Sequence, residues 1–275
     1  MLNNDDDAIE NVSDSQLHVE VIGDGPDLVL LHGWGLNSAC WQHIVPQLSE
    51  HYCLHLVDLP GFGLSYTAFS QSQSLAGIAK ALEGVTPENA TWIGWSLGGL
   101  CASYFALQYP QRVNCLITVA SSPKFMAQEQ GVNGLDWPGI KPDVLSYFNQ
   151  QLAQNLPATI NRFLAIQAMG SVTAKQDIKD LKRLLSLRPE PHIEALTAGL
   201  KLLETVDLRD ELLDLTMPFY RFYGRLDTLV PQSVIELMQA ALPRSGQHIF
   251  QQSSHAPFIS EPDNFVTILR EFLQY

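Results

Sequence analysis

The chain has 275 residues, of which 46% are hydrophobic and 16% are charged, a composition typical of a folded globular protein. Collagen, coiled coil and disorder throughout the chain are excluded. Sixteen Lys and Arg residues against 29 Asp and Glu residues give a net charge of −13, which repels nucleic-acid phosphates and anionic membrane surfaces. We therefore expect neither a nucleic-acid nor a membrane partner.

Residues 1–16 are predicted to form an acidic, disordered tail. They contain neither the basic region nor the apolar run of a secretory signal, and no apolar run in the chain approaches the ~20 residues that span a bilayer. The four cysteines lack CxxC spacing and fit reduced, mostly buried thiols. These features predict a soluble cytoplasmic protein, and we expect a monomer.

From residue 17, short apolar or β-branched runs alternate with amphipathic stretches. The runs predict strands at residues 17–22, 28–32, 54–58, 91–95, 115–120, 218–224 and 247–252. The amphipathic stretches predict helices that start at Ser38 and Ser74, run from Leu97 to Pro110, and cover 231–242 and 264–274. Three central strands are almost continuously apolar, as in parallel sheets covered on both faces. The predicted fold class is therefore α/β with a mostly parallel sheet.

Residues 123–205 interrupt this alternation. They contain several amphipathic helical stretches and no convincing strand. We therefore interpret 123–205 as a helical cap inserted into an α/β core, which residues 17–122 and 206–275 form together.

The most informative motif is GWSLG at residues 94–98, a GxSxG pattern placed where a predicted strand turns into a predicted helix. The glycines let the helix approach the strand closely, and the strained turn projects the hydroxyl group of Ser96 above the sheet. The motif predicts Ser96 as a catalytic nucleophile.

A serine nucleophile needs a base within hydrogen-bond reach and an acid that orients the base. Asp227 and His255 each follow a late predicted strand, in the chain order serine, acid, histidine. Both positions lie at carboxyl ends of strands, where ligands bind in α/β sheets. We therefore predict a Ser96, Asp227 and His255 triad. Three other acids precede their strand and are weaker candidates: Asp207, Asp210 and Asp214.

The loop HGWG at residues 32–35 follows an early strand. Acyl transfer needs two backbone N–H groups aimed at the developing oxyanion, one from such a loop and one from the residue after the nucleophile. We predict the N–H groups of Trp34 and Leu97 for these roles, and a loop-bracing role for His32. No HExxH, paired CxxC, Walker loop or GxGxxG motif follows a strand, so we predict neither a metal nor a cofactor.

Together these motifs resemble the α/β-hydrolase superfamily over the chain from residue 17. DLPGFGLS at 58–65 is similar to the DxPGxGxS loop of that superfamily, and DTLVP at 227–231 is similar to its DxxVP segment. The resemblance implies an α/β-hydrolase fold with helices on both faces of the sheet. Serine at the turn excludes the branches with an aspartate nucleophile, the haloalkane dehalogenases and epoxide hydrolases.

Two cap segments, WPGIKPDVL at 137–145 and RFLAIQAMG at 162–170, resemble the pimeloyl-[acyl-carrier protein] methyl ester esterases of biotin synthesis. The resemblance implies hydrolysis of the methyl ester on a pimeloyl chain that an acyl-carrier protein carries. Apolar residues at helical spacing are also typical of a core, and this alternative stays open for Phe163. For this substrate we predict contacts at Trp34, Leu97, Phe163, Leu164, Ala165, Ile166 and Gln167.

Six of the sixteen basic residues fall between positions 162 and 188, against two acids. If 173–187 is a helix, its basic side chains share one face. The resulting hypothesis is that this face docks the acidic carrier protein, and the alternative is an ordinary solvated helix face. The predicted docking residues are Arg162, Lys175, Lys179 and Arg183.

Two other functions stay open from the sequence. One is a general short-chain carboxylesterase or a C–C bond hydrolase that uses the same triad. The other is a ligand receptor without catalysis on a hydrolase scaffold, against which the complete set of serine, acid, histidine and oxyanion loop argues.

Overall fold

The computed structural model describes residues 16–129 and 136–273, so the predicted tail, apart from Gln16, lies outside the described residues. A seven-stranded sheet has the order β1-β3-β2-β4-β5-β6-β7. β1 is antiparallel to β3, and every other neighbouring pair is parallel, which confirms the prediction of a mostly parallel sheet. The strands are β1 Val19–Ile22, β2 Asp27–Leu31, β3 Cys53–Val57, β4 Ala90–Trp95, β5 Val113–Val119, β6 Phe219–Gly224 and β7 Gly246–Phe250.

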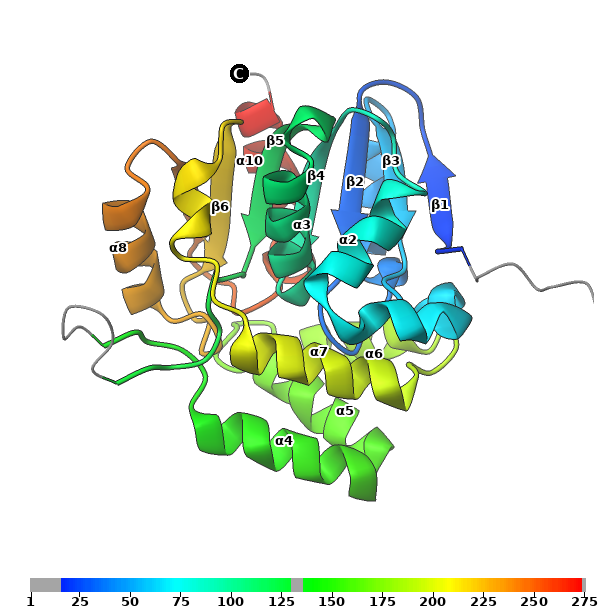
Figure 1. Cartoon of the computed structure of the whole chain (residues 1–275), viewed down its shortest axis with the longest axis vertical. Coiled ribbons are helices and arrows are strands. Elements are labelled where there is room, and N and C mark those ends of the chain that lie inside the picture. Colours follow the sequence, from blue (N-terminus) through cyan, green and yellow to red (C-terminus); the bar gives the residue numbers. More distant parts are fainter. Residues whose placement is uncertain (1–15, 130–135, 274–275) are drawn as a thin grey trace, which may run out of the picture.

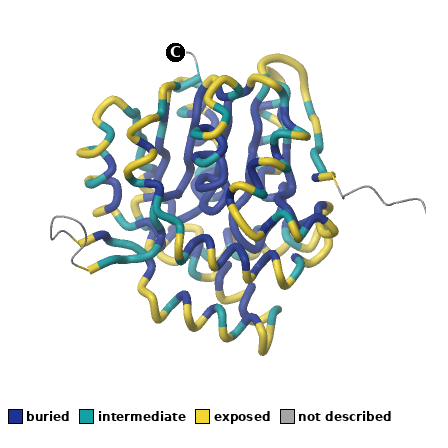
Figure 2. The backbone as a smooth tube through the Cα atoms, in the orientation of Figure 1, coloured by how far each residue is buried: buried dark blue, intermediate teal, exposed yellow. Residues whose placement is uncertain are grey.

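Helices cover both faces of the sheet. α2 (Leu75–Glu83) and α3 (Leu97–Gln108) lie on one face, and α10 (Pro262–Leu273) lies on the other (Figure 1). The buried residues concentrate in the central strands between these layers (Figure 2), and every residue of β4 is buried. The core therefore sits around β4, directly beneath the predicted nucleophile. Further short or peripheral elements accompany the sheet: η3 Pro110–Arg112, η5 Glu211–Asp214, α8 Gln232–Ala241 and α9 Pro257–Ser260.

The first predicted helix differs from the structure. Ser74, where a helix was predicted to start, caps α2, because its hydroxyl accepts the N–H of Gly77 at 3.0 Å. Ser38, a possible cap from the sequence, is instead the first residue of its helix. Asn37 takes that role, and a 3₁₀ helix, η1 (Ser38–His43), is followed by the short α1 (Val45–Leu48). Pro46 has no N–H to continue one helical ladder through this stretch, so the predicted single helix was wrong.

In the described residues between β5 and β6, the α-helices are α4 (Pro142–Gln154), α5 (Leu156–Gln167), α6 (Ala174–Leu185) and α7 (Ile193–Thr205). They lie across the edge of the sheet where the parallel strands end (Figure 1), and α7 packs against a 3₁₀ segment, η2 (Gly63–Gln73). The described part of 123–205 holds isolated bridges at Met126–Ile140 and Gln128–Trp137 but no named strand. The helical content is as predicted, and the division into core and cap stays our proposal.

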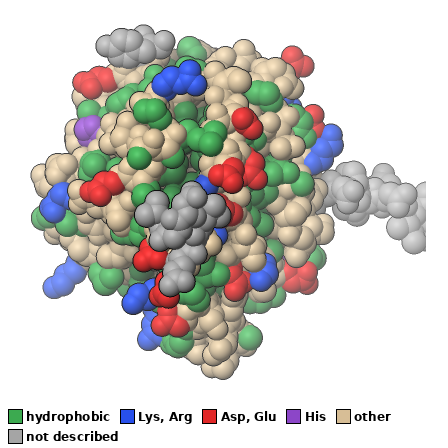
Figure 3. All heavy atoms as spheres, turned by 60° about the vertical axis from the view of Figure 1, so that its left-hand side comes forward, with side chains coloured by type: hydrophobic (Ala, Val, Ile, Leu, Met, Phe, Trp, Pro, Cys, Tyr) green, Lys and Arg blue, Asp and Glu red, His purple; other side chains and the backbone are tan. Residues whose placement is uncertain are grey.

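Charge is mixed on the face that Figure 3 shows, where acidic and basic side chains occur side by side without one sign covering the surface. No helix within the two described ranges is long and apolar enough to span a membrane.

The turn from β4 into α3 is strained. Ser96 has φ +54° and ψ −117°, a positive φ that a non-glycine residue seldom adopts. A Cβ atom at Gly94 would lie 2.3 Å from the Gly98 carbonyl oxygen, and one at Gly98 would lie 2.4 Å from the Leu31 carbonyl oxygen. Both positions therefore require glycine, and the close approach places Ser96 at the carboxyl end of the sheet, as predicted.

A buried histidine braces the loop after β2. The Nδ1 group of His32 donates to the Gly33 carbonyl oxygen at 2.8 Å, and its Nε2 atom accepts the N–H of Leu59 at 3.0 Å. A carbonyl can only accept and an N–H can only donate, so the two bonds together require the neutral imidazole. They tie the loop after β2 to the loop after β3, which confirms the bracing role.

The buried histidine predicts a pH dependence of stability. Burial lowers the pKa of His32 from its ordinary value of 6.5, although nearby Asp58 opposes this. As pH falls, the imidazole of the unfolded chain therefore takes up a proton at a higher pH than the imidazole of the folded chain. The free energy of unfolding then falls as pH drops below about 6.5, by at most ~1.4 kcal/mol per pH unit for one group.

Replacement of His32 by Gln removes this titration. We expect the free energy of unfolding of His32→Gln, measured by urea denaturation between pH 7 and pH 5, to depend less steeply on pH than that of the wild type. Equal slopes for the two proteins would contradict the assignment of the neutral form.

Candidate active site

Ser96, His255 and Asp227 form one hydrogen-bonded series. The Ser96 hydroxyl lies 2.8 Å from His255 Nε2, and His255 Nδ1 lies 2.7 Å from Asp227 Oδ2. The residues are 2%, 0% and 6% exposed, so the series is shielded from water. With Nδ1 protonated toward the carboxylate, Nε2 is free to take the serine proton, which is the arrangement of a nucleophile, a base and an orienting acid.

The carboxylate of Asp227 is oriented by its own loop. Its Oδ1 atom accepts the backbone N–H groups of Leu229 at 2.8 Å and Val230 at 3.1 Å, which leaves Oδ2 for His255. A Cβ atom at Gly224 would lie 1.8 Å from the Ser254 carbonyl oxygen. The loops after β6 and β7 therefore pack closely, and this packing brings the acid to the histidine.

The competing acid Asp207 has a different role. Its carboxylate binds Lys124 at 3.0 Å and Arg209 at 2.7 Å. Burial opposes ionisation, but hydrogen bonds from Arg209 and Lys124 outweigh it and lower the pKa of Asp207 to about 2. Asp207, which lies near the end of the segment between β5 and β6, is thus tied to Lys124 near the start of that segment. Among the described residues, its carboxylate contacts two cations and no imidazole.

The two predicted oxyanion donors belong to segments next to Ser96. A Cβ atom at Gly33 would lie 3.2 Å from the Cβ atom of Ser96, so the residue before Trp34 is adjacent to the nucleophile. Leu97 is the first residue of α3, where backbone N–H groups have no acceptor within the helix. Both positions are compatible with donation to a developing negative charge at Ser96.

Sequence reasoning missed the contribution of α7. The indole N–H of Trp34 donates to the Leu196 carbonyl oxygen at 2.8 Å. A Cβ atom at Gly199 would lie 2.6 Å from Trp34 Cδ1 and 3.3 Å from Leu97 Cδ2. Helix α7 therefore contacts both predicted oxyanion residues, and the only local sign of this in the sequence is one glycine inside a helical pattern.

The predicted substrate contacts on α5 separate onto two faces. Phe163 and Leu164 are buried, and the ring of Phe163 meets the indole of Trp34 edge to face at 4.6 Å between centroids. Ile166 is partly buried, whereas Ala165 is exposed. The helical turn of about 100° per residue points Ala165 away from the buried side, so the structure does not bring it to the other predicted contacts.

Gln167 has an unusual environment. Its side chain is 0% exposed, and neither its amide nitrogen nor its amide oxygen has a hydrogen-bond partner among the described residues. Its backbone carbonyl accepts the N–H of His255 at 3.0 Å. A buried amide without a partner costs on the order of 1–3 kcal/mol, and this one belongs to the residue whose backbone carbonyl binds His255.

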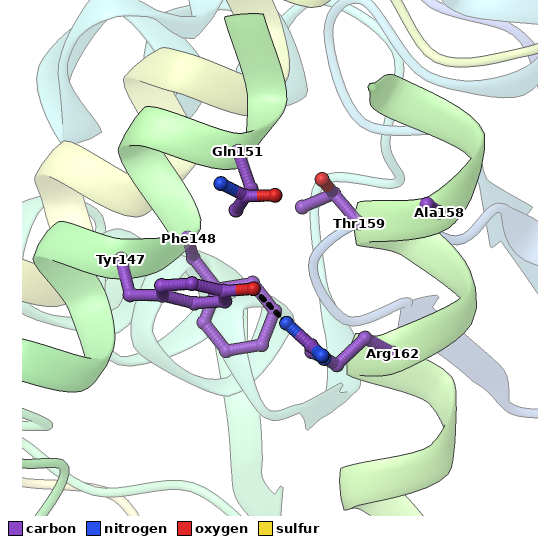
Figure 4. Close-up of a pocket in the computed structure, with 6 residues that line it drawn as sticks. All are labelled: Tyr147, Phe148, Gln151, Ala158, Thr159 and Arg162. Carbon is purple, nitrogen blue, oxygen red and sulfur yellow. Dashed lines mark hydrogen bonds between the residues drawn. The ribbon is translucent and has the colours of Figure 1, made fainter. Parts of the chain in front are cut away.

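A cavity of about 200 Å³ lies between α4 and α5 (Figure 4). The guanidinium of Arg162 lies over the ring of Tyr147, 5.1 Å from its centroid, and hydrogen-bonds to its hydroxyl. Phe148 contacts Phe163 edge to face at 5.7 Å, so aromatic rings lead from this cavity to Trp34. The cavity is lined by Tyr147, Phe148, Gln151, Ala158, Thr159 and Arg162.

The predicted basic helix is present as α6, two residues shorter at its carboxyl end than expected. Its basic side chains are all exposed: Lys175, Lys179, Lys182 and Arg183. Asp177 instead is buried and accepts the hydroxyls of Ser171 at 2.7 Å and Ser260 at 2.9 Å. Asp177, the acid in the first turn of α6, therefore points into the protein and does not neutralise the exposed basic side chains.

Comparison with known proteins agrees with this geometry. The α/β hydrolase fold family matches residues 26–262. A pimeloyl-[acyl-carrier protein] methyl ester esterase from Vibrio parahaemolyticus serotype O3:K6 is 51% identical, with 94% of this chain and 99% of the relative covered. One from Aeromonas salmonicida is 54% identical, with 93% and 98% covered.

A solved esterase from Exiguobacterium antarcticum shares the fold, with a TM-score of 0.82 at 23% identity over 94% of this chain and 96% of that one. The similarity to the curated relatives extends over nearly the whole of both chains. This chain therefore belongs to the α/β hydrolase fold family and, within it, to the pimeloyl-[acyl-carrier protein] methyl ester esterases.

Proposed function

We propose that this protein hydrolyses the methyl ester of pimeloyl-[acyl-carrier protein] methyl ester to give methanol and pimeloyl-[acyl-carrier protein], in biotin synthesis. The observation that carries the proposal is the 51% identity over 94% of the chain to an esterase of that name. The hydrogen-bonded series from Ser96 to His255 to Asp227 supplies the chemistry that such a reaction needs.

The reaction has two halves. Ser96 Oγ attacks the ester carbonyl carbon while His255 Nε2 takes the serine proton, and the backbone N–H groups of Trp34 and Leu97 stabilise the oxyanion. His255 then returns the proton to the leaving methoxide, and methanol departs from an acyl-enzyme. In the second half His255 deprotonates water, which attacks the acyl-enzyme, and the proton passes to Ser96 as the carboxylic acid is released.

The side chains that α5 and the loop after β2 place near Ser96 are the proposed contacts of the acyl chain. Phe163, Leu164 and Trp34 offer apolar surface for methylene groups, and the unpartnered amide of Gln167 is the polar group that fixes the ester among them. Orientation by one buried hydrogen-bonding group inside apolar walls is typical of small-molecule sites.

The exposed basic face of α6 supplies a docking surface. Acyl-carrier proteins are small and strongly acidic, and a chain of net charge −13 would repel them on average. Lys175, Lys179 and Arg183 have no ion-pair partner within 4.0 Å in the part of the chain that the structure describes. Together with the exposed Arg162 on α5, they give the carrier protein a complementary patch that steers its encounter.

The function is tested directly with the carrier-bound substrate. Purified protein should convert pimeloyl-[acyl-carrier protein] methyl ester to the free acid, detected by the loss of a methylene unit in mass, with higher kcat/KM than for free short-chain esters. Ser96→Ala should lower turnover on the order of a millionfold. Retention of more than a hundredth of the wild-type turnover, or equal efficiency on short-chain esters, would exclude the proposed mechanism or substrate.

The acid of the triad is tested by two matched substitutions. Asp227→Asn should lower kcat on the order of ten-thousandfold, because an amide stabilises the wrong imidazole tautomer. Asp207→Asn should leave kcat near the wild-type value and lower thermal stability, because it removes ion pairs to Lys124 and Arg209. Steady-state kinetics and thermal unfolding separate these effects, and a silent Asp227→Asn would contradict the triad.

The docking surface is tested by charge reversal. The triple change Lys175→Glu, Lys179→Glu and Arg183→Glu should cut kcat/KM for the carrier-bound ester at least tenfold at low salt, where screening is weak. Hydrolysis of a small free ester should stay close to wild type.

A control variant has the same charge change at exposed positions outside α6: Lys80→Glu, Lys201→Glu and Arg244→Glu. We expect it to keep most of the activity on the carrier-bound ester. Equal losses in the two triple variants, or equal losses on both substrates, would show that net charge or folding rather than docking causes the effect.

A further inference from the structure

A second cluster of reactive side chains lies at the opposite end of the sheet from the triad. Asp27 is the first residue of β2, and Cys53 and His55 lie on β3. Asp27 pairs with Cys53 in the parallel register, and residues two apart on a strand share a face. The three side chains therefore project together from the amino ends of two adjacent strands.

The donor atoms of this cluster converge. His55 Nε2 lies 2.6 Å from Asp27 Oδ1 and 3.6 Å from Cys53 Sγ, and all three donor atoms lie within 4.8 Å of one another. No other group of three His, Cys, Asp or Glu donors meets this spacing in residues 16–129 and 136–273. A single imidazole nitrogen thus faces both a thiol and a carboxylate.

We propose that Asp27, Cys53 and His55 bind a divalent transition-metal ion of the zinc type, with water as a fourth ligand. Thiolate, imidazole and carboxylate are the three side-chain donors that Zn²⁺ takes in proteins. Zinc bond lengths of ~2.0–2.3 Å in a tetrahedron need donor separations of roughly 3.3–3.6 Å. The sulfur to nitrogen separation of 3.6 Å already meets this requirement.

Only the carboxylate has to move. Asp27 Oδ1 must withdraw by roughly 0.7 Å from His55 Nε2 to reach a tetrahedral separation, and the Asp27 side chain is 36% exposed at the start of its strand, so rotation is open to it. The side chain of His55 is 13% exposed, which leaves solvent access for the ion and for its bound water. The site therefore needs little rearrangement to form.

Charge and protons balance at this site. Binding replaces the thiol proton of Cys53, which is released to solvent. The Nε2 proton that His55 donates to Asp27 in the metal-free protein leaves as well, and neutral His55 then coordinates through the lone pair of Nε2 with its remaining proton on Nδ1. The thiolate and the Asp27 carboxylate then neutralise the two charges of the ion. Burial together with Asp27 and Asp24 raises the pKa of the free Cys53 thiol, so binding should strengthen as pH rises.

The position indicates a structural role. The site would join the first residues of β2 and β3, whereas Ser96, Asp227 and His255 lie at carboxyl ends of strands. Cys53 is also the only cysteine of the four that is not buried. An ion here would stabilise the folded chain by binding it in preference to the unfolded chain, without a part in ester hydrolysis.

Cobalt and zinc titrations test the site. Metal-free protein titrated with Co²⁺ should develop a thiolate-to-cobalt charge-transfer band that Zn²⁺ abolishes. Excess Zn²⁺ should raise Tm by roughly 5 °C at a hundred times the dissociation constant. Cys53→Ser should lose the band, and Asp27→Asn and His55→Gln should weaken binding at least tenfold.

His51→Gln is the matched control, because it removes an exposed imidazole at the same edge of the sheet but outside the cluster. It should retain the band, the affinity and the shift in Tm. The proposal is overturned if wild-type protein gives no thiolate band, if the band survives in Cys53→Ser, or if His51→Gln loses as much affinity as His55→Gln.

Discussion

The strained turn at Ser96 is the constraint on which the rest of the site depends. A φ of +54° at this residue reverses the chain between β4 and α3 within one residue, and this is compatible with a buried sheet only because Gly94 and Gly98 lack side chains. The turn has two results at once. It places the Ser96 hydroxyl beside His255 Nε2, and it leaves Leu97 as the first residue of α3, where a backbone N–H has no acceptor within the helix.

The other participants are brought to this turn from separate strand ends. Asp227 and His255 arrive on loops after β6 and β7, and the N–H of Leu226 in the first loop donates to the Ser253 carbonyl in the second at 3.0 Å. The loop with the predicted oxyanion donor Trp34 follows β2 and is held by His32. Because adjacent parallel strands end at one edge, four short loops can meet without a long connection.

The sequence predicted the three residues that the structure joins by hydrogen bonds, because each is defined locally, by a motif or by its place after a strand, and the sheet topology then brings the three together. Sequence reasoning missed Gly199 and Leu196, whose contacts with Trp34 join positions more than 160 residues apart. No local pattern encodes such a contact. The candidate cap Ser38 was wrong because its polar neighbour Asn37 supplies the capping acceptor instead.

The convergence of Asp27, Cys53 and His55 was not predicted from the sequence for a similar reason. Two residues at positions i and i+2 of a strand share a face, but the third donor, Asp27, reaches them only through the register between β2 and β3. Metal motifs with fixed spacing cannot describe such a group, because strand pairing rather than chain separation sets its geometry.

The burial of the triad constrains how a carrier-bound ester can be hydrolysed. Ser96 is 2% exposed beneath α4 to α7, so the acyl chain has to pass this helical layer. One helix, α5, presents Arg162 on its exposed side and Phe163 and Gln167 on its buried side. On the proposed function, α5 therefore contacts the acidic carrier outside and the ester inside. Under that proposal, a displacement of this helix on docking would change the surroundings of the buried ester and would couple recognition of the carrier to positioning of the ester.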